Sequence, residues 1–516
     1  MDLNESQKTQ RELLLSPGLL ADVEANSNRI LTDINEIRII DYGVVYEDNH
    51  KPNISYSAIS AYVCDAGYVK MVTDDSSASY TLYQFNMKTG YYQAISVEKF
   101  YENIIRDIKY NYPELEQIPT KFKTHMELDV LPFIQTVDEI IKPKDFESLE
   151  ILYNDGEVIP FKNGFYSVRY NRFLPRTSYK FVLNPLSVDF NPEALDSDIC
   201  DKYFEMIDDE CCFEYMFELI GYSLYATKFI IPTYMVLYGS GANGKSIVID
   251  TISRILGESN ISRVSLEDMT NPHIVAQAEN KRVNIVTDAG AGYRESAFKS
   301  ISAVPSFMKT ASAGELWMFN PKYKAPHAGV APSKFIFASN NFLNFGDSSD
   351  GTNRRLHAIP FSKTFQEDFA LVQRFKGDEE TEWFAMMALI AFKNIIHRAM
   401  KGAENETGMQ LKGEYIKCDT GKSTKVDMIV ANSVVEDFIY NVLEVNILDK
   451  DAVRKALDGY EDLYWELKTY CEEVGRKCIS QTKLTQHLKS QYKLINTRTS
   501  YMDGVDIKHK YVIKLA

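Results

Sequence analysis

The fold is decided by one stretch of sequence, Tyr234-Met-Val-Leu-Tyr238-Gly239-Ser240-Gly241-Ala242-Asn243-Gly244-Lys245-Ser246-Ile-Val-Ile-Asp250. Its apolar start predicts a buried strand, the pattern G-x-x-x-x-G-K-S predicts a phosphate-binding loop, and the residues from Lys245 onward predict a helix. Glycines let backbone N–H groups turn inward around phosphates, and the start of the helix adds partial positive charge. Every residue from Gly239 to Ser246 is therefore expected to line a nucleotide site.

Two side chains of this loop carry the expected chemistry. Lys245 can reach the β- and γ-phosphates of ATP, and the hydroxyl of Ser246 can hold Mg²⁺. ATP and Mg²⁺ are therefore the expected cofactors. A second Gly-Lys-Ser, at 421–423, has neither a glycine five residues earlier nor an apolar strand before it. It is not expected to bind phosphate.

A phosphate loop of this kind needs a metal-orienting carboxylate at the end of a neighbouring strand. The apolar segment 282–288 ends in Asp288, which makes Asp288 the candidate catalytic and metal-binding carboxylate. A further apolar segment, 334–341, ends in Asn340 and Asn341, and an amide there can position the attacking water. The plain alternatives are an ordinary strand-end aspartate and a simple turn.

An arginine pair, Arg354 and Arg355, follows in Gly351-Thr-Asn-Arg-Arg355. An exposed arginine after a loop can act as an arginine finger on the nucleotide of the next subunit. A surface charge pair is the plain alternative.

The order and spacing of these motifs resemble superfamily 3 helicases, in particular the phage, plasmid and mobile-element group related to phage primase-helicases and the poxvirus primase-helicase. The resemblance covers about residues 155–361 and 456–516. It implies an AAA+ motor in which Lys245 and Ser246 bind nucleotide and Mg²⁺. Asp288 would be the Walker B residue and Asn340 the sensor 1 residue. Arg354 or Arg355 would be the arginine finger. Many relatives have two adjacent acids in Walker B, whereas Thr287 precedes Asp288 here. The general base is therefore either Asp288 alone or Asp288 assisted by Glu295.

A basic and aromatic segment, Trp317-Met-Phe-Asn-Pro-Lys322-Tyr323-Lys324-Ala-Pro-His327, lies between the Asp288 and Asn340 segments. The resemblance implies a β-hairpin projecting into the central pore of a hexameric ring. Lys322 and Lys324 offer charges for DNA phosphates, while Tyr323 and His327 offer stacking or hydrogen-bonding surface. An ordinary basic surface hairpin is the alternative. Lys309 is a weaker candidate for coupling the nucleotide to this hairpin.

The C-terminal segment is basic although the whole chain has a net charge of −15, since residues 476–516 contain nine Lys or Arg against two Asp. Ser480 is the expected N-cap of a helix over Gln481–Gln491 that carries Lys483, His487 and Lys489. A strand over Lys510–Leu515 would follow a turn at 503–504. This pattern predicts a winged helix that binds double-stranded DNA, with an origin as its target; a protein-docking winged helix is the alternative.

The length predicts several domains, and the alternation of short apolar strands with helices over 226–361 predicts an α/β protein. The expected units are an N-terminal α+β domain of unknown role (1–100), a domain preceding the motor (101–225), the AAA+ P-loop motor (226–365), a helical lid and linker (366–450) and the winged helix (451–516). A helical start from Gln7 to Ile40, a hairpin after the strand Tyr80–Phe85 and a linker over 401–430 are also expected. Seven cysteines without a C-x-x-C pair favour a reduced cytoplasmic compartment, here that of a bacterial host, and no apolar run is long enough to span a membrane.

The leading interpretation is an ATP-dependent DNA helicase and replication initiator of a phage, plasmid or mobile element. It would act as a homohexamer on single-stranded DNA, with a separate primase as a partner. A bifunctional primase-helicase is one alternative, although residues 1–100 show no carboxylate pair on an apolar strand and Asp196-Ser-Asp198 lies in a polar segment. A DNA-binding adaptor that uses nucleotide only as a switch, and an ATPase acting on proteins, are the others.

Overall fold

A five-stranded parallel sheet contains the strand that precedes the glycine-rich loop. Its strands are β11 (Thr233–Tyr238), β12 (Ile261–Ser262), β13 (Val283–Val286), β16 (Lys334–Ser339) and β17 (Leu356–Pro360), in the spatial order β12-β13-β16-β11-β17. The strands expected around 234–238, 282–288 and 334–341 are confirmed as β11, β13 and β16. Their residues are buried on both faces, which is the rule for parallel strands covered by helices on two sides.

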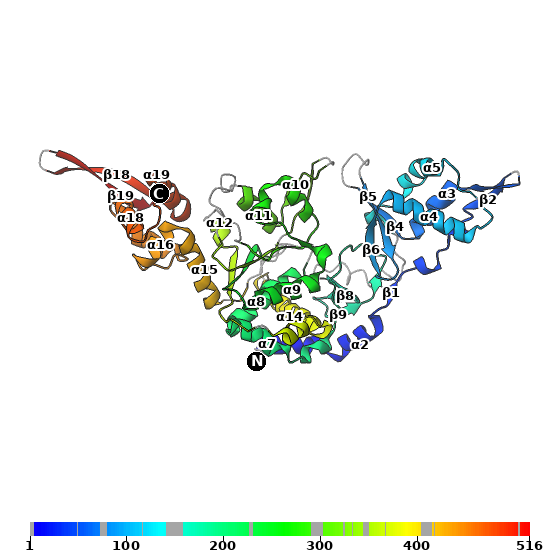
Figure 1. Ribbon diagram of the computed structural model, residues 1–516, viewed down its shortest axis with the longest axis horizontal. Helices are drawn as coiled ribbons and strands as arrows, with labels where there is room; N and C mark the ends of the chain where they lie inside the picture. The colour runs from blue at the N-terminus through cyan, green and yellow to red at the C-terminus, as the bar shows by residue number, and fades with distance from the viewer. Residues whose placement is uncertain are drawn as a thin grey trace.

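The two faces of this sheet contribute to separate hydrophobic cores. On β11, Met235 and Leu237 pack with helices α8, α9 and α14, whereas Tyr234 and Val236 pack on the other face with α11. The helices of these layers are α7 (Ile199–Ile207), α8 (Glu210–Ser223), α9 (Lys245–Leu256), α10 (Pro272–Val275), α11 (Ala303–Ser312), α12 (Asp350–Asn353), α13 (Phe369–Arg374) and α14 (Asp378–Ala403). Figure 1 shows α10 and α11 above the sheet and α9 and α14 below it.

The computed structural model describes residues 5–48, 50–72, 80–115, 117–140, 158–225, 231–289, 303–322, 326–332, 334–343, 350–366, 368–403, 415–416, 418–503 and 506–515. The chain is a mixed α/β protein with several sheets, and its elements are spread along one long axis in Figure 1. Among the described helices, none has both the length and the apolar character needed to cross a bilayer.

The N-terminal elements include a three-stranded antiparallel sheet, β4-β5-β6. They are α1 (Glu5–Leu14), α2 (Pro17–Asn26), β1 (Ile30–Leu31), β2 (Val45–Asp48), β3 (Lys51–Ile54), α3 (Tyr56–Asp65), β4 (Tyr68–Val72), β5 (Tyr80–Asn86), β6 (Tyr91–Ile95), α4 (Val97–Asn111) and α5 (Phe122–Asp129). The hairpin expected after Tyr80–Phe85 is confirmed, and Gly90 in its turn has a φ of 73°. The expected helix from Gln7 to Ile40 is wrong, because it breaks before Pro17 and ends at Asn26.

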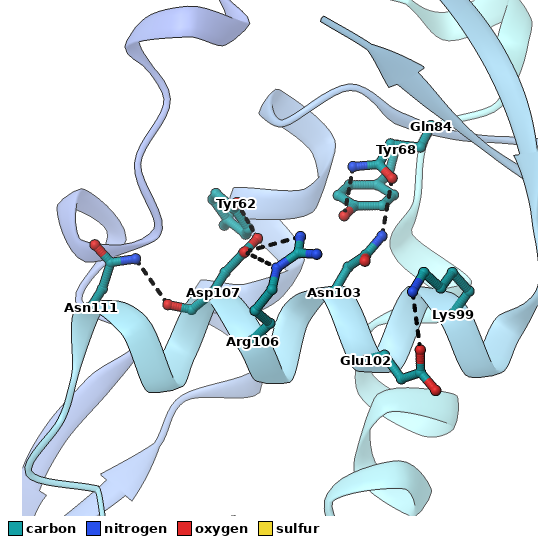
Figure 2. A network of polar contacts seen from close by, with 9 residues as sticks. All are labelled: Tyr62, Tyr68, Gln84, Lys99, Glu102, Asn103, Arg106, Asp107 and Asn111. Atoms are coloured by element: carbon teal, nitrogen blue, oxygen red, sulfur yellow. Dashed lines mark hydrogen bonds and ion pairs between the residues drawn. The ribbon is translucent and has the colours of Figure 1, made fainter. Parts of the chain in front are cut away.

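Helix α4 is joined to the strands of this sheet by polar side chains (Figure 2). The amide of Asn103 donates to Gln84 Oε1 at 3.1 Å, and Gln84 donates to the Tyr68 hydroxyl at 3.0 Å. On the same helix, Asp107 accepts from the Tyr62 hydroxyl at 3.2 Å. These contacts fix α4 against α3 and β5, and they add a side-chain link between β5 and β4.

Four short strands connect this region to the central sheet: β7 (Val158–Phe161), β8 (Gly164–Ser167), β9 (Arg172–Leu174) and β10 (Arg176–Thr177). The first three form an antiparallel sheet, and β10 pairs with β1. This pairing ties the segment that follows α2 to the segment that follows β9.

The C-terminal elements are α15 (Asp419–Asn432), α16 (Val434–Asn441), α17 (Lys450–Leu457), α18 (Leu463–Glu473), α19 (Gln481–Tyr492), β18 (Leu494–Asp503) and β19 (Asp506–Leu515). The expected linker over 401–430 is wrong for its second half, because α15 begins at Asp419. Gly421 allows this helix to approach the central sheet, since a Cβ there would lie 3.0 Å from the carbonyl oxygen of Ala358 in β17. The second Gly-Lys-Ser is therefore the first turn of a packed helix.

Candidate nucleotide site

The glycine-rich loop joins β11 to α9, and the helix begins at Lys245 as expected. Gly244 has a φ of 91°, and a Cβ there would lie 2.5 Å from the sulfur of Met206 on α7. Both its conformation and its surroundings therefore require glycine. The N-cap residue of α9 is Gly244, which has no side chain to cap the first N–H groups of the helix, so they can donate to an anion such as phosphate.

Lys245 lies inside the loop that precedes it. Its ammonium group donates to the carbonyl oxygens of Gly239 at 2.7 Å and Ser240 at 2.9 Å, and to Asn243 Oδ1 at 2.9 Å. The amide of Asn243 in turn donates to the Phe361 carbonyl at 3.1 Å, which fixes the loop against the end of β17. Burial lowers the pKa of Lys245, and a phosphate oxygen would restore a charged partner.

The carboxyl ends of three strands meet beside this loop. Parallel pairing sets Val286 of β13 and Val236 of β11 on either side of Phe337 in β16. Hydrogen bonds continue past the strand ends, with the N–H of Ala289 donating to Ala338 at 2.9 Å. The N–H of Gly239 likewise donates to the carbonyl of the last residue of β16, at 3.2 Å. The residues just after each strand therefore share one edge of the sheet.

Asp288 and Asn340 both follow their strands at this edge and both are exposed. Because β16 lies between β13 and β11, Asn340 stands between the loop and Asp288. The exposed hydroxyl of Ser246 is on the first turn of α9. A hydroxyl and a carboxylate are ligands that suit Mg²⁺, so Ser246 and Asp288 fit a metal bound with a triphosphate. Glu295 lies outside the described residues.

The arginine pair lies at the opposite edge of the same sheet. Leu356, the first residue of β17, pairs with Tyr234 at the start of β11. The length of β11 therefore separates Arg354 from the glycine-rich loop by roughly 15–20 Å. Neither arginine can reach the nucleotide site of its own chain across that distance.

The two arginines differ in their surroundings. Arg355 is 6% exposed, and its guanidinium donates to Ser312 Oγ at 3.0 Å and to the Gly351 carbonyl at 2.5 Å. Arg354 is exposed to solvent. Of the two candidates for an arginine finger, only Arg354 can reach another molecule, so the assignment to Arg355 is corrected to a structural one.

The expected hairpin between the Asp288 and Asn340 segments is formed by β14 (Leu316–Phe319) and β15 (His327–Val330). Lys322 is exposed beyond β14, whereas Tyr323 and Lys324 lie outside the described residues. His327 is already paired, because its Nε2 lies 2.8 Å from the carboxylate of Glu279 and its side chain is only 27% exposed. The assignment of His327 to DNA binding is therefore corrected.

The helix expected over Gln481–Gln491 is confirmed as α19, with the Ser480 hydroxyl accepting from the N–H of Lys483 at 3.3 Å. Lys483 and Lys489 are exposed. His487 instead points inward, and its Nε2 lies 2.8 Å from the carboxylate of Glu436, which is 3% exposed. His487 is thus part of the core of the C-terminal elements and is not available to DNA.

Two buried cations at the amino edge of the sheet were not expected. Arg282 donates to the carbonyls of Leu224 and Asn184, each at 2.7 Å, and the ammonium group of Lys334 donates to the carbonyl of Tyr225. Positive charge at the carbonyl end of α8 is favoured by the helix dipole. The only signal in the sequence is a basic residue directly before or at the start of an apolar strand, which is too common to identify such a role.

The fold and the site define a mixed α/β protein whose parallel sheet carries a glycine-rich loop of the phosphate-binding pattern. Residues 237–355 match a protein family that is described as a family of unknown function, DUF5906. This segment contains the loop, Asp288, Asn340 and both arginines. No curated protein matches the chain.

Three solved apo structures of the C-terminal region of NrS-1 are similar to the chain over most of its length. The first has 11% identity, covers 88% of this chain and 98% of that one, and has a TM-score of 0.45. The second has 13% identity, 91% and 100% coverage and a TM-score of 0.45. The third has 10% identity, 84% and 93% coverage and a TM-score of 0.39. These scores are too low to establish a common fold.

Proposed function

We propose that the chain is an ATP-dependent DNA helicase with an AAA+ motor, acting as a ring of six copies in the replication of a phage, plasmid or mobile element. The observation that carries this proposal is the carboxyl edge of the parallel sheet, where the glycine-rich loop, Asn340 and Asp288 meet. Lys245 and the start of α9 would bind the triphosphate of ATP, Ser246 and Asp288 would hold Mg²⁺, and Asn340 would orient the attacking water.

A ring is supported by the position of Arg354. An exposed arginine at the amino edge cannot serve the nucleotide of its own chain, because the sheet separates the two. It can serve the nucleotide of a neighbouring copy that presents its carboxyl edge, and such head-to-tail contacts form a ring when the rotation between copies closes on itself. ATP would then lie between two subunits, and its hydrolysis would change how they pack.

Contact with DNA is supported by exposed lysines on two elements. Lys322 extends beyond β14, and Lys483 and Lys489 lie on α19 within a basic C-terminal segment. The hairpin would carry one DNA strand through the ring, and α19 with the β18–β19 hairpin as a wing would bind double-stranded DNA such as an origin.

The alternatives receive less support. A primase needs paired carboxylates, but the residues of β4, β5 and β6 include no aspartate or glutamate, and Asp198 forms an ion pair with Arg374. We therefore propose that a separate primase serves this helicase. A nucleotide-switched adaptor would need no water-positioning residue, whereas Asn340 lies where one is required.

The proposal is tested by measuring ATP hydrolysis and strand separation on a forked DNA duplex. Lys245→Ala should abolish both, because the phosphates lose their charged partner, while the chain remains folded. Lys422→Ala is the matched control, since this lysine belongs to the second Gly-Lys-Ser and lies exposed on α15. The control should match the wild type. Turnover retained in Lys245→Ala would refute the nucleotide site, and a wild-type ATPase unaffected by DNA would refute the helicase.

A further inference from the structure

A cluster of sulfur and oxygen donors lies where the starts of α8 and α15 meet. Cys212 and Cys418, which are 206 residues apart in sequence, have their sulfur atoms 3.0 Å apart and are both buried. A carboxylate oxygen of Asp209 lies within 4.8 Å of both sulfur atoms. Three ligand atoms of the kind that bind transition metals therefore face one another inside the protein.

Each donor is fixed by the helix that it begins. Asp209 is the N-cap of α8 and accepts from the N–H of Cys212 at 2.6 Å, while Cys418 is the N-cap of α15 and its sulfur accepts from the N–H of Gly421 at 3.2 Å. The hydroxyl of Thr420 donates to Asp209 at 2.7 Å and links the two helix starts.

A fourth donor is adjacent in sequence. Cys211, half-buried on the first turn of α8, directly precedes Cys212, and its thiol would have to turn toward the other three donors to become the fourth ligand. Three sulfur atoms and one carboxylate are a donor set that selects zinc over hard cations such as Mg²⁺. Thiolates on one tetrahedral zinc ion lie about 3.8 Å apart, given Zn–S bonds of about 2.3 Å. The Cys212 and Cys418 sulfur atoms would need to separate by less than about 1 Å.

We propose that Asp209, Cys211, Cys212 and Cys418 bind one structural zinc ion that ties α15 to α8. Because α15 packs on β17 and leads into the C-terminal helices, this ion would fix the attachment of those helices to the central sheet. A disulfide between Cys212 and Cys418 is the competing outcome, and it would leave neither sulfur atom as a thiolate that could bind the ion.

The test uses the full chain purified without chelators. Elemental analysis should give about one zinc ion per chain, and replacement by Co²⁺ should give the sulfur-to-metal charge-transfer and visible bands of a tetrahedral thiolate site. Cys212→Ser and Cys418→Ser should lose the metal and these bands. Cys64→Ser, which changes a half-buried cysteine on α3, is the control and should retain both.

Two results would overturn the proposal, and neither depends on the folding of a variant. One is a folded wild-type chain that contains no zinc and gives no thiolate bands with Co²⁺. The other is a mass spectrum, taken after alkylation under denaturing conditions, in which Cys212 and Cys418 are joined by a disulfide.

Discussion

The two edges of the central sheet differ in what their polar side chains contact. At the amino edge, Arg282, Lys334 and Arg355 are buried, and they donate to carbonyl, amide and hydroxyl oxygens of the same chain. At the carboxyl edge, Asp288 and Asn340 are exposed. Satisfied, buried polar groups stabilise a fold, whereas exposed groups gathered at one edge can bind a ligand. The contrast assigns structural roles to the buried, paired groups and chemistry to the exposed ones.

The adjacent arginines give the strongest test of this contrast. Arg354→Ala should reduce ATP hydrolysis on the order of a thousandfold, because the transition state loses an arginine from the neighbouring subunit. Arg355→Ala should instead lower the free energy of unfolding by about 2–3 kcal/mol, since buried Ser312 loses its partner. Steady-state hydrolysis and urea unfolding of both variants would separate the roles.

Mixed rings are the control for action between subunits. Combining Arg354→Ala with Lys245→Ala copies should restore part of the hydrolysis, because some interfaces then pair an intact loop with an intact arginine. No recovery at any mixing ratio would contradict the proposed ring.

At the carboxyl edge, Asp288→Asn should reduce hydrolysis about a hundredfold by weakening the hold on Mg²⁺. The thermal unfolding midpoint should not change, because the side chain is exposed. Phosphate release measured over a Mg²⁺ titration checks the first point and calorimetry the second. An unchanged rate at saturating Mg²⁺ would move the metal-binding role to another carboxylate.

At the amino edge, Lys334→Met should change how stability depends on pH. Burial lowers the pKa of Lys334 to about 7 from an ordinary value of 10.5. The folded chain therefore binds fewer protons than the unfolded chain between those values, and wild-type stability gains from rising pH across that window. Below about pH 7 the cost of the buried charge is fully present, so the methionine variant should be the more stable by about 1–3 kcal/mol.

Thermal unfolding of both proteins between pH 6 and pH 9 measures this difference. The advantage of the variant should shrink as the pH rises. Parallel pH profiles for the wild type and Lys334→Met would show that the lysine remains charged and well solvated in the fold.

The same contrast between exposed and internally paired groups recurs on α19 and gives the smallest expected effect. Lys483→Ala should weaken DNA binding by about 1 kcal/mol and reduce the salt-dependence slope by about 0.9. His487→Gln should leave that slope unchanged and lower stability, because Glu436 loses its partner. Binding titrations at several salt concentrations test both, and a reduced slope in His487→Gln would contradict the inward orientation.

Local sequence was enough to predict the elements that carry the nucleotide site. Five adjacent apolar residues before a glycine-rich loop have few alternatives to a buried strand, and the strands ending near Asp288 and Asn340 were predicted for the same reason. The polar and glycine-rich composition of residues 401–430 led to the wrong prediction of a linker in its second half. Helix α15 forms there because the packing of Gly421 against β17 outweighs the low helix propensity of glycine.

The sequence by itself determined the phosphate-binding pattern, its flanking strand and helix, and the cap of α19, because each depends on residues close together in the chain. Only the tertiary structure decided which arginine is exposed, that His327 and His487 are paired with carboxylates, and that Cys212 meets Cys418. Those outcomes depend on partners such as Ser312, Glu279 and Glu436, which come from distant segments. A side chain's role follows from what surrounds it, and its sequence neighbours supply only part of that surrounding.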